Sequence, residues 1–230
     1  MARINELAPS ARNDNSDSRL QTALDFAARG FKIFPQSREK RPLLQGWPTN
    51  ATDDPKKIES WFKKHPEANF AFVTGKPSDC IVLDVDVKNG QKGEDSLKRL
   101  EEEHGKIDTT LIVRTPSGGS HYYFNYPPDL NGVKNVPQLA GYSGLEIKGD
   151  NGCITLPGSI YKNGMKYIVE RDSPIAPCPE WLKKLLQRTR PVKHKANTGE
   201  RPPLYCRHCK WKGFNRSEGK NRSGRHYLCR

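Results

Sequence analysis

The stretch Cys80-Ile81-Val82-Leu83-Asp84-Val85-Asp86-Val87 decides how the rest of this chain is interpreted. It is a run of aliphatic and β-branched residues that holds two aspartates, and such a run is typical of a buried strand. Residues two apart in a strand point to the same face, so Asp84 and Asp86 are expected about 7 Å apart along it. A divalent metal with oxygen ligands, Mg²⁺ or Mn²⁺, would suit this pair of charges. The alternative is a strand end whose acids face water or meet lysine and arginine.

Composition limits the class of protein. The 230 residues suit one domain with an appendage. A net charge of +13 and a sequence pI near 9.5 favour a polyanionic partner, either nucleic acid or an anionic membrane surface. No apolar stretch approaches the length of a membrane span, and residues 1–18 lack the apolar core of a secretory signal. We therefore expect an intracellular, cytoplasmic protein with no membrane partner, whose six cysteines serve in packing or metal binding.

The order of the predicted elements indicates an α+β body over residues 18–188. A polar segment, 1–17, precedes the body and is expected to be disordered, and a linker, 189–203, leads from it to a basic tail, 204–230. Helices are expected from residue 18 or 19 to Gly30, from Pro55 behind an Asp54 cap, and over 96–104 and 179–187. Beside the central run, strands are expected at 31–34, 69–73, 111–113, 121–124, 145–148, 153–156 and 166–170.

Two later motifs hold further candidate residues. The turn Ser117-Gly118-Gly119 has backbone N–H groups that could approach an anion, and His121 follows it at a strand mouth as either a structural or a catalytic residue. Glu146 and Lys148 share one face of a strand, where the simplest interpretation is a solvated ion pair. The turn at 150–152 predicts a hairpin in which 153–156 returns beside that strand.

Taken in order, the motifs resemble a known family. They are Gly30-Phe31 to Pro35 with Lys40-Arg41-Pro42, Trp47 with 52–55, 69–75, Asp84-x-Asp86, Thr115-Pro116-Ser117-Gly118-Gly119-x-His121, and 146–150 with Leu156-Pro157-x-Ser159. This set resembles the bifunctional DNA primase/polymerase N-terminal (Prim-Pol) domain of the archaeo-eukaryotic primase superfamily. The resemblance covers about 18–186. It implies an RRM-like catalytic sheet beside a smaller N-terminal α/β subdomain.

The resemblance also implies roles for single residues. Asp84 and Asp86 match the first acidic motif, which binds the divalent metals, and His121 matches the histidine that contacts the phosphates of the incoming nucleotide. Glu146 takes the third acidic position, where the family more often has Asp, although Glu can bind the same metals. The remaining nucleotide-binding candidates are Ser117, Gly118, Gly119, Lys148 and Lys40.

The implied activity is that of a template-dependent DNA primase/polymerase. Such an enzyme would bind single-stranded DNA and nucleoside triphosphates, join the nucleotides by two-metal nucleotidyl transfer, and could work with a separate replicative helicase. Two alternatives are a non-catalytic replication protein that binds single-stranded nucleic acid, and a two-metal nuclease that uses the same acids.

The tail carries a separate pattern. Two cysteines spaced C-x₂-C are followed by H-x₂-C, and this resembles a small zinc finger with the ligands Cys206, Cys209, His226 and Cys229. Zn²⁺ would be the main source of order in so short and basic a segment. The alternative is a disordered basic tail with incidental cysteines.

Overall fold

A computed structural model of the protein describes residues 18–139, 141–188, 204–205 and 212–214. The chain divides into two compact units, residues 1–190 and 191–230. In the second unit, β10 (Leu204–Tyr205) pairs antiparallel with β11 (Lys212–Phe214). The segment 1–17 and the four predicted zinc ligands, Cys206, Cys209, His226 and Cys229, lie outside the described residues.

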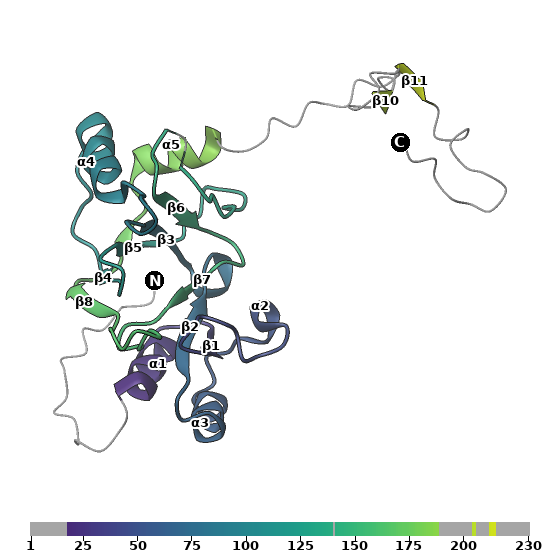
Figure 1. Ribbon diagram of the computed structural model, residues 1–230, viewed down its shortest axis with the longest axis vertical. Coiled ribbons are helices and arrows are strands. Elements are labelled where there is room, and N and C mark those ends of the chain that lie inside the picture. The colour runs from purple at the N-terminus through teal and green to yellow at the C-terminus, as the bar shows by residue number, and fades with distance from the viewer. Residues whose placement is uncertain (1–17, 140, 189–203, 206–211, 215–230) are drawn as a thin grey trace. The chain divides into compact units, whose positions relative to one another are not determined.

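The first unit contains two sheets (Figure 1). The larger sheet has the order β6-β3-β5-β4-β8, with the strands β3 (Cys80–Val85), β4 (Ile112–Arg114), β5 (Ser120–Asn125), β6 (Leu145–Lys148) and β8 (Ile168–Arg171). The smaller sheet has the order β1-β2-β7, with β1 (Ile33–Gln36), β2 (Asn69–Val73) and β7 (Cys153–Thr155). These pairs are antiparallel, and a short β9 (Ala176–Pro177) pairs parallel with β5. The α+β class predicted from the sequence is thus confirmed.

The helices lie beside both sheets. They are α1 (Ser18–Ala28), α2 (Trp47–Asn50), α3 (Pro55–Lys64), α4 (Gly93–His104) and α5 (Glu180–Arg188), with a 3₁₀ turn at Lys76–Ser78. The predicted cap of α3 is confirmed, because the Asp54 carboxylate accepts a hydrogen bond from the Lys56 N–H. No helix in the described parts of the chain has the length and apolar character that a bilayer crossing requires.

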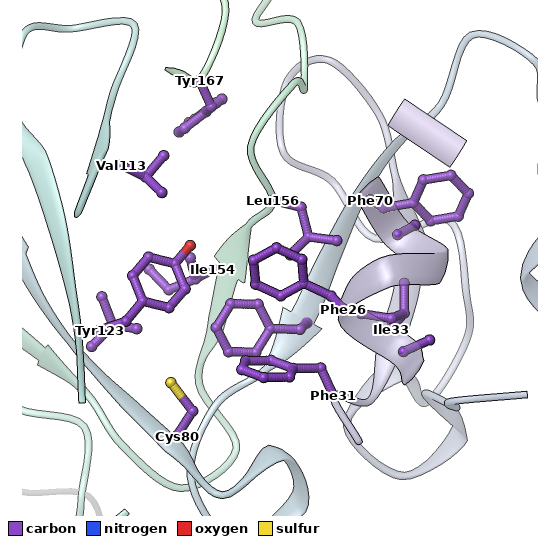
Figure 2. Close-up of a cluster of buried hydrophobic side chains, with 14 of the residues drawn as sticks. Phe26, Phe31, Ile33, Phe70, Cys80, Val113, Tyr123, Ile154, Leu156 and Tyr167 are labelled. Atoms are coloured by element: carbon purple, nitrogen blue, oxygen red, sulfur yellow. The ribbon is translucent and has the colours of Figure 1, made fainter. Parts of the chain in front are cut away.

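The alternation of side chains along β3 separates two cores. Ile81, Leu83 and Val85 point into a core shared with α4 and α5. Cys80 and Val82 point the other way, into a core that the larger sheet shares with the smaller sheet, α1 and α3. Figure 2 shows this second core, where Phe26 and Phe31 meet Cys80 and Tyr123. Since Asp84 continues the series Cys80, Val82, it lies on the face of β3 that is turned toward the smaller sheet.

The predicted hairpin between 145–148 and 153–156 is wrong. β7 leaves the larger sheet and pairs with β2, with Ala71 opposite Thr155. The hydrophobic side chains explain this crossing, because Ile154 and Leu156 are buried in the core between the sheets. The crossing is also fixed by Asp150, whose carboxylate accepts hydrogen bonds from the backbone N–H groups of Lys76 and Val133.

Other corrections concern element ends. β1 runs through Pro35, where the sequence predicted its end, and β1 is an edge strand that can tolerate a missing N–H. α4 begins three residues before the predicted start, at Gly93. The predicted loop at 36–50 contains the short helix α2.

Candidate active site

Three neighbouring strands bring three of the predicted site residues into one row. Asp84 on β3 lies opposite His121 on β5 and, on its other side, opposite Glu146 on β6. Residues paired directly across antiparallel strands point to the same face of the sheet. The three side chains therefore share the face turned toward the smaller sheet, and the Asp84 Oδ1 is 3.5 Å from the His121 Nε2.

Asp86 lies one residue beyond the end of β3, which the sequence had placed at Val87. Its backbone N–H donates to the Gly144 carbonyl at 2.7 Å, and its carbonyl accepts from the Gly93 N–H at 3.2 Å. A Cβ on either glycine would lie 2.5 Å from the Asp86 carbonyl oxygen, so only glycine permits this close approach. The two glycines thus fix the backbone of Asp86 between the start of α4 and the start of β6.

Two lysines neutralise the carboxylates. The Lys148 Nζ lies 2.5 Å from the Glu146 Oε2 and 3.7 Å from the Asp84 Oδ2, and the Lys88 Nζ lies 2.8 Å from the Asp86 Oδ2. Desolvation lowers the pKa of both lysines, but hydrogen bonds and charges from these carboxylates outweigh it and raise each pKa. Burial likewise raises the pKa of Asp86, and the bonds from Lys88 reverse this to a net lowering. The site is therefore a compensated set of charges.

Lys40 joins the site from the loop after β1. It adopts a left-handed backbone with φ 67°, and its Nζ lies 5.7 Å and 5.4 Å from the ring centres of Tyr161 and Tyr167. Desolvation of the ammonium group lowers its pKa, and the charge of Lys88 adds to this, while Asp84 and Asp86 oppose it. Sequence reasoning did not identify the two tyrosines, although they flank the Asn163-Gly164 turn signal.

His121 is buried, with only 4% of its surface exposed. Burial lowers its pKa to about 4, against the opposing charge of Asp84, so the imidazole is neutral at pH 7. Its ring stacks on that of Tyr167 at 5.9 Å, and its Nδ1 has no hydrogen-bond partner among the described residues. The imidazole therefore keeps a free polar nitrogen inside the site.

The Ser-Gly-Gly turn packs against the end of β3. A Cβ on Gly119 would lie 2.1 Å from the Val85 carbonyl oxygen, so this glycine brings the turn against the strand that carries Asp84. Within the turn, the Gly118 N–H already donates to the Thr115 carbonyl. Ser117 is exposed, and its hydroxyl lies 3.0 Å from the Thr115 hydroxyl.

The donor chemistry fits a hard divalent cation. Asp84 and Glu146, which pair across β3 and β6, and Asp86, just beyond the end of β3, supply carboxylate oxygens, the ligands that Mg²⁺ and Mn²⁺ prefer. As these side chains stand, no three His, Cys, Asp or Glu residues in the described ranges converge into a metal-holding group. Lys148 instead lies between Asp84 and Glu146. A metal at this place would need Lys148 to leave its carboxylate partners.

Two comparisons with known proteins bear on this site. A family model described as bifunctional DNA primase/polymerase, N-terminal, matches residues 23–181. That range contains Lys40, the three carboxylates, the Ser-Gly-Gly turn, His121 and Lys148. A search of curated proteins found no match to the chain.

Proposed function

Because the family match over residues 23–181 shows that the chain belongs to the bifunctional DNA primase/polymerase N-terminal family, we propose that it is a template-dependent primase/polymerase acting on single-stranded DNA. The reaction would join nucleoside triphosphates by two-metal nucleotidyl transfer. One observation carries the proposal: Asp84 lies in register between His121 and Glu146, with Lys148 between the two carboxylates. The larger sheet would then serve as the RRM-like catalytic sheet that the family resemblance implies.

The carboxylates would form the metal end of the site. Asp84, Asp86 and Glu146 would hold Mg²⁺ or Mn²⁺, which supplies charge stabilisation for the attacking 3′-oxygen and the leaving pyrophosphate. The Gly93 and Gly144 contacts hold Asp86 in place relative to β3 and β6. A ligand that is fixed before the substrate arrives adds no reorganisation to the reaction.

The cations and the histidine would form the phosphate end. Lys148 can exchange its carboxylate partners for phosphate oxygens, since charge-assisted bonds to either anion are similarly strong. Lys40 has a pKa lowered by desolvation, and a phosphate oxygen near it would compensate for the lost hydration. The Nδ1 of His121 has no hydrogen-bond partner among the described residues, so the neutral imidazole could use it for a polar contact with a phosphate group.

Primer synthesis tests this proposal. The protein is incubated with a single-stranded template, labelled nucleotides and Mn²⁺, beside an Asp84→Asn, Asp86→Asn double variant. Glu102→Gln is the matched control, because it removes a carboxylate from the exposed face of α4. We expect elongated product from the wild type and the control, and a loss of 100-fold or more in the double variant, on the order of 3 kcal/mol.

Two other outcomes would overturn the proposal. Shortened template that depends on Asp84 and Asp86 would indicate a two-metal nuclease. Template binding without product, at every metal and nucleotide tried, would indicate a non-catalytic single-strand-binding protein.

A separate replicative helicase is a further proposed partner. Stimulation of synthesis on duplex DNA by an added replicative helicase would test it.

We also propose that Cys206, Cys209, His226 and Cys229 bind one Zn²⁺ ion. The support is their C-x₂-C and H-x₂-C spacing. Metal analysis of the purified full chain should find about one zinc per chain. A Cys206→Ser, Cys209→Ser variant should lose it, whereas a Cys80→Ser variant should keep it. Equal zinc contents in the wild type, the Cys206→Ser, Cys209→Ser variant and the Cys80→Ser variant would contradict this proposal.

A further inference from the structure

A groove of about 240 Å³ adjoins the candidate site at β6. Glu146 and Lys148 form one wall of it, so the groove opens directly beside the carboxylates. The other walls come from α2, from the segment before β6 and from the start of β7, and they include Trp47, Val136, Pro137 and Cys153. The groove thus combines an aromatic and aliphatic lining with a charged end.

The walls of this groove are already fixed. The Trp47 ring stacks on the buried Phe34 ring, with centres 4.7 Å apart and planes inclined by 29°. Val136 and Ile147 exchange backbone hydrogen bonds at 2.9 Å. The Asn135 side chain accepts from the Gly149 N–H and donates to the Asp150 carbonyl, so its amide is held as well. A ligand that enters the groove would meet a preformed surface.

The order of groups across the larger sheet sets which part of a nucleotide could lie there. From the groove inward come Glu146 and Lys148 on β6, Asp84 on β3 and His121 on β5. The Lys40 Nζ lies 5.4 Å from the centre of the Tyr167 ring, and that ring stacks on His121. In a nucleoside triphosphate, the terminal phosphates and the base extend in opposite directions from the α-phosphate.

We propose that the Trp47 groove receives the base of the incoming nucleoside triphosphate. With the terminal phosphates at His121 and Lys40 and the α-phosphate above Asp84 and Glu146, the sugar and base extend past β6 onto the groove. Aromatic surfaces stack on every base, so this contact gives affinity without selecting a sequence. The inference rests on the proposed function, because it takes the carboxylates as the site of nucleotidyl transfer.

Binding measurements on the full chain test the groove. Dissociation constants are measured with Mn²⁺ for a nucleoside triphosphate, for inorganic tripolyphosphate and for a single-stranded oligonucleotide, each alone. We expect Trp47→Ala to weaken the nucleoside triphosphate roughly tenfold and Trp47→Phe to restore most of the affinity. Tripolyphosphate and oligonucleotide binding should stay within about twofold of wild type. Trp181→Ala is the matched control, because Trp181 is a half-buried tryptophan on α5, outside the groove lining.

Two results would overturn the inference while the proposed function stood. Equal weakening of tripolyphosphate and nucleoside triphosphate would show that Trp47 only supports the fold. Weakened oligonucleotide binding with unchanged nucleotide binding would show that the groove holds the template strand. Conversely, the wild type could make no polymer while Trp47→Ala selectively loses affinity for the nucleoside triphosphate. This result would support the groove as the base site and reject the proposed polymerase function.

A second measurement needs no substitution. Cys153 lies in the groove wall, and burial raises the pKa of its thiol, so alkylation with N-ethylmaleimide is followed at mildly alkaline pH. Peptide mass analysis separates Cys153 from the tail cysteines. The nucleoside triphosphate should slow alkylation of Cys153 several-fold, and tripolyphosphate should not. The buried Cys80 and Cys178 report any unfolding. Equal rates with and without a saturating nucleotide would contradict the inference.

Discussion

His121 couples the stability of the protein to pH. Its pKa is about 4 in the folded chain, against 6.5 for an ordinary histidine. Between these values the unfolded chain binds more protons, so folding stability should fall as the pH drops from 6.5 to 4, by up to about 3 kcal/mol. His121→Gln should remove that part of the slope. Urea unfolding at several pH values, with a chelator present, measures it.

The control for this prediction is His65→Gln, at the end of α3. That variant should keep the slope of the wild type. A His121→Gln protein that loses stability as steeply as the wild type would show that other groups, such as the carboxylates, account for the acid sensitivity.

Lys148 should compete with a divalent metal for the carboxylates. It now supplies the positive charge between Glu146 and Asp84, so Lys148→Ala removes the ammonium group that pairs with both acids. Mn²⁺ should therefore raise the Tm of Lys148→Ala more than that of the wild type, by about 2–4 °C per kcal/mol of added stabilisation. Thermal unfolding with and without Mn²⁺ measures the difference.

Lys183→Ala is the matched control, since Lys183 on α5 also pairs with two carboxylates. These are Glu180 on the same helix and Asp129 in the loop after β5. Mn²⁺ should affect it as it affects the wild type. The same Mn²⁺ response in both lysine variants would mean that the metal does not bind at Asp84 and Glu146.

At the scale of single elements, the glycine contacts around Asp86 predict a matched pair of variants. Gly144 and Gly90 have nearly the same φ, 76° and 77°, but of the two only Gly144 lies against Asp86. Alanine at either position adds about 1–2 kcal/mol of backbone strain. Gly144→Ala should cost a further 1–3 kcal/mol or so from the clash, and should reduce nucleotide addition by displacing Asp86.

Denaturant unfolding and primer synthesis measure both effects. Gly90→Ala should lose stability and keep synthesis. If the two variants behave alike, the contacts of Gly144 do not position Asp86.

The sequence predicted most of the strands but not how they pair. A continuous apolar run predicted a buried strand at 80–85 and alternation predicted a strand at 145–148, and both local patterns persist in the structure. The hairpin prediction for 153–156 failed because local turn chemistry permits it, whereas burial of Ile154 between two sheets depends on β2, about 80 residues earlier. The row His121, Asp84, Glu146 likewise follows from long-range register. The family resemblance implied that these residues share one site, and residue spacing alone did not.

At the scale of the whole first unit, Asp150 joins the two places where the chain passes between the sheets. Its carboxylate accepts from the Lys76 and Val133 N–H groups and from the Tyr126 hydroxyl. Asp150→Ala would leave these donors without that acceptor, and hydrogen bonds to charged groups are worth about 1.5–3 kcal/mol each before relaxation. We expect a loss of about 2 kcal/mol or more in the free energy of unfolding.

Denaturant unfolding tests this expectation, with the exposed Asp172→Ala as the control. The control should unfold at the denaturant midpoint of the wild type. If Asp150→Ala unfolded at the same denaturant midpoint as the wild type and Asp172→Ala, hydrophobic packing alone would hold the crossing from β6 to β7.

The two sheets contribute different parts of the site. The carboxylates and His121 belong to the larger sheet, whereas Lys40 and Trp47 follow β1 of the smaller sheet. The core of Phe26, Phe72 and Tyr123 sets the spacing between them. Substitutions in that core can therefore adjust substrate affinity in small steps. They change the distance of the Lys40 ammonium group and the Trp47 indole from the carboxylates, and leave the carboxylates in register with one another.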